Sequence, residues 1–589
     1  MARCFINTVP VTVFLFELLS LLALRGAWAA AAAKQQQLKC AASSFASILQ
    51  PAGAVLEKIA SVPEGGSYGE GAAADVAYPT NPTNLPALCA LTVRVASSKT
   101  TSYRFGLFLP TTAGRWEGKF LAVGNGGFAG GINWLDMAPG PHYGMATIST
   151  DLGHNSTVAD LSWALRSPGK KTDWGWRALH GSIVLGKQLT EAFYGGRKIS
   201  YSYYNGCSTG GRQGLRELQA FPDSFDGALV GAAAWWTTHL NDYVTRLGMY
   251  NLPVASPGHI STSDMGNLAD EVVRQCDAAD GVSDGIVSSP ELCTFDFSRM
   301  LCGDQNPGVD GAACLNAQQI QTAQHAYADY HSSVDGRFLY PGLTLSSEDQ
   351  WFILLGGTEP SPFGVGYQRY FLFDNPDWDW HDYNDSIVDF AERTDPGQAT
   401  AAEFDIHEYK DRGGKIIMYH GLADGLVPTK GSEYYYNQTI TTFGGLEKTT
   451  DFFRLFLIPG MQHCWGTPVD APWNIAGAFQ PGSMSTSEWS VPGYKDSKHD
   501  ALMALMDWVE KGSPVDEIVA TTWKSSMDPT SGVLRQRPLC PWPAKAVYNG
   551  KGDVNVSSSW SCLKTTTGTG ANSWAGGGGG GLGNKHKLI

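Results

Sequence analysis

Runs of apolar residues alternate with segments of helical periodicity in two separate stretches of the chain. In the first stretch the pattern predicts strands at residues 119–123, 145–150, 199–205 and 228–232, and an amphipathic helix at 179–194. In the second stretch it predicts strands at 415–419 and 451–458, and a helix at 499–511. Strands that alternate with helices indicate an α/β architecture.

The stretch between these two regions has a different composition. Residues 240–404 are rich in Asp, Gly, Pro, Ser and Cys, and the regular alternation lapses there. We interpret this stretch as a large lid domain inserted into one α/β core, whose two parts are residues 40–239 and 405–562. The length of 589 residues agrees with this, because it exceeds the usual size of one compact core.

The two ends of the chain differ from its body. Arg3 precedes an apolar run at 11–24, and Ala27-Trp28-Ala29 has the small-x-small pattern of a cleavage site, so residues 1–29 are predicted to be a secretion signal. The run is shorter than the roughly 20 residues of a membrane span, so no membrane partner is expected. Residues 563–589 are rich in Gly and Thr, and we predict a disordered tail.

Composition and charge narrow the class of protein. Apolar residues make up 43% of the chain, enough for a sizeable core, and a net charge of −14 argues against a nucleic-acid partner. Removal of Cys4 with the signal leaves ten cysteines, and an even number in a secreted chain indicates up to five disulfides. These cysteines are Cys40, Cys89, Cys207, Cys276, Cys293, Cys302, Cys314, Cys464, Cys540 and Cys562. The candidate N-glycosylation sites are Asn155, Asn384, Asn437 and Asn555.

The strongest local motif is Gly206-Cys-Ser-Thr-Gly210, which lies between a strand-like segment and the helix-like residues 212–220. A G-x-S-x-G sequence in this setting is typical of a nucleophile elbow, in which small glycines allow a strained turn to present the serine hydroxyl. We therefore predict Ser208 as a catalytic nucleophile. The alternative is a plain glycine turn that caps a helix.

A serine nucleophile needs a base and an orienting acid, which follow it in the order Ser, acid, His in α/β-hydrolases. Asp424 lies in a loop after the predicted strand 415–419, and His463 lies in a loop after the strand 451–458. We predict them as the acid and the base. Asp424 could instead be an Asp-Gly turn residue, and His420, four positions earlier, is expected to stabilise the same loop.

The proposed nucleophile and base each have a cysteine neighbour, Cys207 and Cys464, which must come close if the triad forms. At this point the chain resembles the tannase and feruloyl esterase family, whose hallmark is a Cys-Ser, Asp, His-Cys arrangement. The resemblance covers nearly all of the mature chain. It runs through residues 206–215, 234–240, 276–287, 420–428 and 459–465. Residues 208–214 look most like the type B feruloyl esterase branch, with fungal tannases as close relatives.

The resemblance implies an α/β-hydrolase core and a disulfide that joins Cys207 to Cys464. An oxyanion hole usually takes one N–H from the residue after the nucleophile and one from an earlier glycine-rich loop. Thr209 supplies the first. The segment 123–128 resembles the family's glycine-rich loop, so Gly126 or Gly127 is expected to supply the second, with Gly127 preferred. The alternative is an ordinary hairpin glycine run.

A second candidate site lies in the predicted lid. Asp277, Asp280 and Asp284 stand three and four positions apart, with Gly281 and Gly285 available for tight turns, and carboxylate oxygens are the ligands that calcium prefers. The resemblance implies a structural Ca²⁺ held by these three side chains and by the carbonyls of Val282 and Ile286. The alternative is an acidic, solvated loop closed by a Cys276–Cys293 disulfide.

Together these features predict a secreted serine carboxylesterase. The resemblance implies feruloyl (hydroxycinnamoyl) esters of plant cell-wall polysaccharides such as xylan as substrates. Trp235, Trp236 and Trp465 flank the motifs and are candidates to face the aromatic acyl group. Two alternatives stay open: a tannase that cleaves galloyl esters, and a non-catalytic, secreted binding glycoprotein on the same fold.

Overall fold

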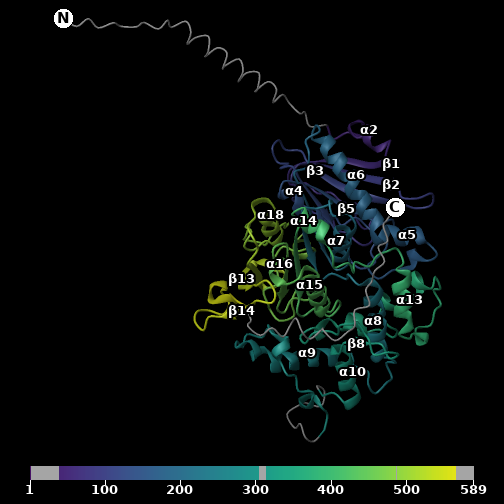
Figure 1. The fold of residues 1–589 in the computed structure, drawn as a ribbon, viewed down its shortest axis with the longest axis vertical. Coiled ribbons are helices and arrows are strands. Elements are labelled where there is room, and N and C mark those ends of the chain that lie inside the picture. Colours follow the sequence, from purple (N-terminus) through teal and green to yellow (C-terminus); the bar gives the residue numbers. More distant parts are fainter. Residues whose placement is uncertain (2–38, 304–313, 486, 565–589) are drawn as a thin grey trace.

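The computed structural model describes residues 1, 39–303, 314–485 and 487–564 (Figure 1). The predicted secretion signal, apart from Met1, and the predicted tail beyond Lys564 lie outside the described residues. Leu563, which we assigned to the tail, is the last residue of strand β15 (Trp560–Leu563).

A nine-stranded sheet forms the centre of the molecule, in the order β1-β2-β3-β5-β4-β6-β7-β10-β11. The strands are β1 (Ala54–Val62), β2 (Leu88–Ala96), β3 (Ser102–Pro110), β4 (Lys119–Val123), β5 (Met145–Thr150), β6 (Tyr201–Cys207), β7 (Gly227–Gly231), β10 (Lys415–Gly421) and β11 (Phe453–Ile458). The neighbours from β1 to β5 pair antiparallel, and those from β5 to β11 pair parallel. Parallel strands are covered on both faces, and every residue of β4, β5 and β7 is buried.

Helices cover the two faces of this sheet. Successive strand residues point to opposite faces, so Phe120 and Leu121 of β4 belong to two separate hydrophobic cores. The first core includes side chains of α6 (Ala178–Phe193), α7 (Thr209–Ala220) and α15 (Thr429–Phe443). The second includes side chains of α3 (Trp134–Met137) and α18 (Ala501–Lys511). The parallel strands therefore lie between two helical layers, and their carboxyl ends lead into loops at one edge.

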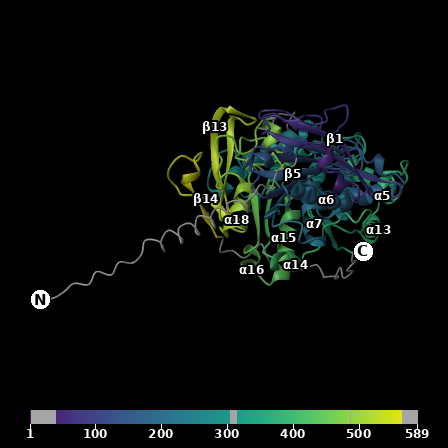
Figure 2. The same ribbon diagram turned by 90° about the horizontal axis from the view of Figure 1, so that it is seen from above.

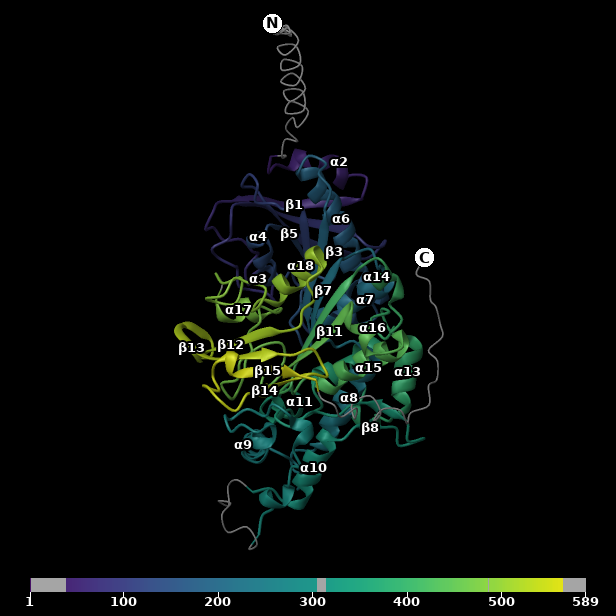
Figure 3. The same ribbon diagram turned by 60° about the vertical axis from the view of Figure 1, so that its left-hand side comes forward.

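The segment between β7 and β10 contributes no described strand to the central sheet. It contains α8 (Thr237–Tyr250), α9 (Thr262–Cys276), α10 (Ala317–Tyr327), α11 (Phe352–Leu355), α12 (Pro362–Gly366), α13 (Ser386–Thr394), α14 (His407–Asp411), β8 (Tyr330–His331) and β9 (Phe338–Tyr340). The predicted lid, residues 240–404, falls within this segment. Figures 1 and 3 show α8, α9 and α10 at the end of the molecule opposite β1.

The C-terminal residues form two hairpins that lie beside the core (Figure 2). These are β12 (Ile518–Ser525) with β13 (Asp528–Leu539), and β14 (Lys545–Tyr548) with β15. The remaining short helices are α2 (Ala46–Leu49), α4 (Pro139–His142), α5 (Pro168–Thr172), α16 (Leu446–Thr450) and α17 (Gln480–Met484). None of the described helices is long and apolar enough to cross a membrane.

The ten cysteines that we predicted to form disulfides are paired in the structure. The pairs are Cys40–Cys89, Cys207–Cys464, Cys276–Cys293, Cys302–Cys314 and Cys540–Cys562. Four of them close loops of 12 to 49 residues, whereas Cys207–Cys464 spans 257 residues. That single bond therefore joins parts of the chain that only the folded core brings together.

Candidate active site

Ser208 occupies the sharp turn between β6 and α7. Its backbone has φ 63° and ψ −126°, which is strained for a residue with a side chain. The turn is closely packed, since a Cβ added at Gly206 would lie 2.8 Å from the carbonyl carbon of Gly210. This strand, turn and helix have the geometry of a nucleophile elbow.

Asp424 and His463 lie in the loops that follow β10 and β11, two neighbouring parallel strands. Nδ1 of His463 is 2.7 Å from Oδ2 of Asp424. The other carboxylate oxygen of Asp424 accepts the N–H groups of Leu426 and Val427, each at 2.9 Å. The loop therefore fixes the carboxylate, and the carboxylate fixes the imidazole.

A second histidine contacts the same carboxylate. Nε2 of His420 is 2.9 Å from Oδ2 of Asp424, and its Nδ1 is 2.8 Å from the hydroxyl of Ser432. Burial alone would raise the pKa of Asp424, but His463 and His420 together hold it below its ordinary value of 3.8. Asp424 is thus an anion at neutral pH. His420 is fully buried and supports the acid loop, as its position in the sequence indicated.

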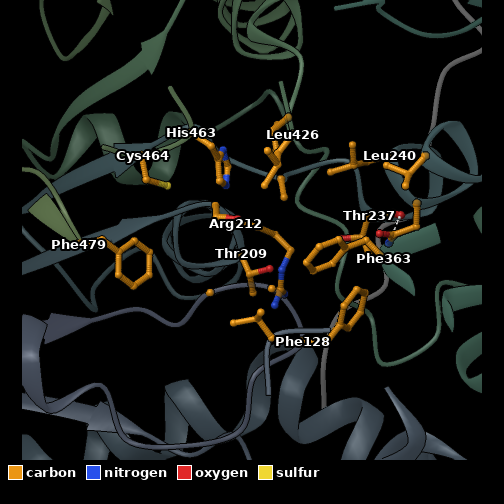
Figure 4. A pocket seen from close by; sticks show the side chains of 18 of the residues that line it. Phe128, Thr209, Arg212, Thr237, Leu240, Phe363, Leu426, His463, Cys464 and Phe479 are labelled. Carbon is orange, nitrogen blue, oxygen red and sulfur yellow. Dashed lines mark hydrogen bonds between the residues drawn. The ribbon is translucent and has the colours of Figure 1, made fainter. Parts of the chain in front are cut away.

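The Cys207–Cys464 disulfide joins the nucleophile turn to the base loop, with 6.0 Å between the two Cα atoms. Ser208 and His463, the residues next to these cysteines, both line one cavity of about 290 Å³ (Figure 4). The structure therefore brings the three predicted triad residues to the same edge of the sheet. The contact between His463 and Asp424 joins the acid loop to the base loop, and the disulfide joins the base loop to the nucleophile turn.

The predicted oxyanion residues line the same cavity. Thr209 begins α7, where the first N–H groups of a helix have no partner within the helix, and Gly127 comes from the glycine-rich loop after β4. The N–H of Gly126 donates to the hydroxyl of Tyr78 at 2.9 Å, which leaves Gly127 as the better of the two candidates. Gly127 has φ +50°, and a Cβ there would lie 2.6 Å from the carbonyl oxygen of Val158. No motif signalled Tyr78, which lies 48 positions before the glycine that it binds.

The cavity walls are mainly apolar and aromatic. They include Phe128, Trp174, Leu240, Val244, Phe363 and Phe479. In Figure 4, His463 and Thr209 lie between Phe479 on one side and Phe363 and Leu240 on the other. An aromatic ring placed among these side chains would make apolar and edge-to-face contacts over much of its surface.

The prediction for the three tryptophans was wrong for two of them. Trp465 lines the cavity and is 42% exposed. Trp235 and Trp236 do not line it, because they are buried and stacked on each other with ring centroids 5.0 Å apart. The indole of Trp235 donates to the carbonyl of Gly431, so this pair packs the core.

Two more polar residues line the cavity, Asn241 and Arg212. Arg212 belongs to the motif at residues 208–214, whereas no motif marked Asn241. The amide nitrogen of Asn241 donates to the carbonyl of Thr237 at 2.8 Å. Arg212 is fully buried, and its guanidinium donates to backbone carbonyls such as that of Gly175 and stacks on Trp174. Asn241 is thus a fixed polar group, next to Thr237, in a cavity whose walls are mainly apolar.

The predicted calcium loop follows α9 and lies against β13. Oδ1 of Asp277 accepts the N–H groups of residues 284–286 at 3.0 to 3.2 Å. Asp284 forms a buried ion pair with Arg537 of β13. Oδ2 of Asp280 is buried without a hydrogen-bond partner, and burial raises the pKa of this carboxyl. Within the described ranges, no three acidic, histidine or cysteine side chains form a group that could hold a metal, so the three carboxylates are near one another but do not converge.

The four predicted glycosylation sites differ in exposure. Asn155 and Asn384 are exposed. Asn437, within α15, and Asn555 are only partly exposed, and the amide oxygen of each is buried. The first two positions are therefore more accessible to a modifying enzyme.

Comparison with known proteins identifies related sequences. A family model described as "Tannase and feruloyl esterase" matches residues 89–356 and 369–563. A probable feruloyl esterase B of Emericella nidulans is 32% identical over 472 residues, which cover 80% of this chain and 86% of that protein. A probable feruloyl esterase B-1 of Aspergillus flavus is 30% identical over 501 residues, covering 83% and 90%.

Solved structures share the fold. The crystal structure of feruloyl esterase B from Aspergillus oryzae has a TM-score of 0.80 at 28% identity, covering 90% of this chain and all of that one. The tannin acyl hydrolase from Aspergillus niger has a TM-score of 0.66 at 21% identity, covering 88% of this chain and 94% of that one, and shows the fold alone. These likenesses and the sheet described above confirm the predicted α/β-hydrolase class. The chain is a carboxylic ester hydrolase and belongs to the tannase and feruloyl esterase family.

Proposed function

We propose that this protein hydrolyses hydroxycinnamoyl esters, such as feruloyl groups on plant cell-wall polysaccharide fragments, with Ser208, His463 and Asp424 as a catalytic triad. The observation that carries the proposal is the common cavity. Ser208 on its strained turn and His463 bonded to Asp424 line the same apolar, aromatic-walled space. The names of the feruloyl esterase relatives support the choice of acyl group.

In the proposed reaction, His463 takes the proton of Ser208 as the hydroxyl oxygen attacks the ester carbonyl. The negative charge on the carbonyl oxygen is stabilised by the N–H groups of Thr209 and Gly127. The bond to the alcohol then breaks, His463 gives the proton to the leaving oxygen, and an acyl-serine remains. Water attacks this ester in the same way and releases the acid. Asp424 stays ionised and holds the imidazole in the required orientation.

A substrate panel tests the acyl group. We expect methyl ferulate and methyl p-coumarate to be cleaved with a higher kcat/KM than propyl gallate, and peptides to be left intact. Residues 208–214, which resemble the feruloyl branch, and an apolar cavity wall both favour a cinnamoyl group over a ring with three hydroxyls. A higher kcat/KM for propyl gallate would make the protein a tannase, and no hydrolysis of any aromatic ester would overturn the proposal.

We also propose secretion, N-glycosylation and a structural Ca²⁺ at residues 277–286. Five disulfides support an oxidising compartment, and exposed Asn155 and Asn384 support glycosylation. The three carboxylates do not converge in this structure, so the observation that supports the metal is the buried, unpartnered oxygen of Asp280. A cation at this loop would share the Asp284 carboxylate with Arg537 and would neutralise the cluster of negative charge. Mass analysis of the protein secreted by an expressing cell, with and without glycosidase, tests the first two points.

A further inference from the structure

A single helical turn from the segment between β7 and β10 lies against both triad loops. This turn, η7 (Glu348–Gln350), ends in a half-buried glutamine. The side-chain oxygen of Gln350 accepts the backbone N–H of His463 at 3.0 Å and the backbone N–H of Gly425 at 3.2 Å. One acceptor atom therefore joins the base residue to the residue that follows the acid Asp424.

The close approach of η7 is built into the acid loop. A Cβ added at Gly425 would lie 2.6 Å from the carbonyl oxygen of Ser347 and 2.7 Å from Cβ of Gln350. The loop can lie this close only because residue 425 has no side chain.

The turn itself is anchored to its own segment. Glu348 is fully buried and accepts the hydroxyl of Tyr327 at 2.7 Å, and the indole of the fully buried Trp351 donates to the hydroxyl of Ser347 at 3.0 Å. These bonds fix Gln350 relative to α10, so it presents a rigid acceptor to the two loops.

We propose that Gln350 is a positioning residue: it sets the backbone of the base loop relative to the acid loop, and so sets how the imidazole of His463 faces Ser208 and Asp424. This inference rests on the proposed triad. A displacement of about 1 Å in a reacting group can lower a rate on the order of a hundredfold. A side chain that fixes the position of the imidazole can therefore change kcat without contacting the ester. The segment between β7 and β10 thus contributes to catalysis through the protein backbone, without touching the ester.

The test compares three variants of the full chain with methyl ferulate and p-nitrophenyl acetate as substrates. Gln350→Met keeps the length of the side chain but removes the acceptor, Gln350→Glu keeps an acceptor oxygen, and Gln321→Met makes the same change at an exposed position of α10. We expect Gln350→Met to lower kcat about ten- to a hundredfold on both substrates with KM changed less than about twofold. Gln350→Glu should recover kcat to within about threefold of the wild type, and Gln321→Met should match the wild type.

If Gln350→Met and Gln350→Glu lose kcat equally and both have a lowered melting temperature, the role of Gln350 is merely structural and the inference is overturned. A wild-type kcat in Gln350→Met would also overturn the inference. Failure of the proposed triad has a different signature, since Ser208→Ala would then stay active whatever the Gln350 variants do.

Discussion

The central sheet and the segment between β7 and β10 are held together in different ways. The sheet buries continuous apolar strands, and its one long-range disulfide, Cys207–Cys464, lies at the proposed catalytic edge. The segment between β7 and β10 instead consists mainly of helices and loops, with the two local disulfides Cys276–Cys293 and Cys302–Cys314. The core thus places the proposed reacting groups, whereas the segment between β7 and β10 contributes side chains to the cavity wall and hydrogen bonds to the loops after β10 and β11.

The largest effect should come from the nucleophile. Ser208→Ala should lower kcat at least about a thousandfold, because no other group can form the acyl-enzyme, while the melting temperature stays nearly unchanged. Ester hydrolysis and a thermal melt measure the two quantities. Ser490→Ala is a matched control: this serine is also buried, but its hydroxyl bonds Asp500 away from the cavity, so the change should cost stability and spare kcat. Near wild-type activity in Ser208→Ala would show that Ser208 is not the nucleophile and that the proposed triad is wrong.

Removal of the catalytic-edge disulfide and removal of a local disulfide should affect kcat and the free energy of unfolding differently. Cys207→Ala with Cys464→Ala should lower kcat on the order of a hundredfold at temperatures where circular dichroism still reports a folded chain. Loss of this 257-residue cross-link should also reduce the free energy of unfolding, by roughly 5 to 6 kcal/mol in the loop-closure model.

Removal of Cys276–Cys293, which spans 17 residues, should reduce the free energy of unfolding by roughly 3 kcal/mol in the same model and leave kcat within about threefold. If the two double variants lose kcat to the same extent, the contrast between the core and the inserted segment does not hold.

Which strands could be predicted from the sequence depends on how each strand is buried. Buried parallel strands are continuous apolar runs, so the predictions for β4 and β5 match their bounds to the residue. The antiparallel strands at the other edge were not predicted. For β1 the reason is that the strand is mostly solvent-accessible and carries Glu57 and Lys58 in its middle. Here pairing with β2, and not an apolar run, makes the strand.

The residues of the candidate site likewise differ in how far the sequence could predict them. Ser208, Asp424 and His463 lie in the turn and loops that follow strands of the core, and a motif and the chain order indicate them. Gln350 lies 75 positions from one of its partners and 113 from the other, and no local pattern marks such a contact. The apolar neighbours of Trp235 in the sequence likewise do not tell whether it faces a cavity or the core. Periodicity and motifs do not predict contacts that only the tertiary fold creates between distant residues.

A smaller effect should come from Asn241, a polar group that α8 adds to the mainly apolar cavity. Asn241→Leu should lower kcat/KM for methyl p-coumarate about tenfold and leave methyl cinnamate, which lacks the ring hydroxyl, within about twofold. The physical reason is the loss of a hydrogen bond to that hydroxyl, worth on the order of 1 kcal/mol. Leu240→Met, on the same turn, should change the two substrates alike. An equal loss for both substrates in Asn241→Leu would show that the amide only supports Thr237.

The smallest effect on catalysis should come from removing the proposed calcium, because none of the residues 277–286 lines the cavity that Ser208 and His463 share. A ligand that binds only the folded state adds stability in proportion to the logarithm of its concentration over Kd, so a chelator should lower the melting temperature by a few degrees and change kcat at room temperature by less than about twofold. Added Ca²⁺ should restore the melting temperature. In Asp280→Ala the chelator should have no further effect, because the oxygen that is buried without a partner is gone. If neither the chelator nor Asp280→Ala moves the melting temperature, the loop is held without a metal, by Cys276–Cys293, by the hydrogen bonds to Asp277 and by the ion pair of Asp284 with Arg537.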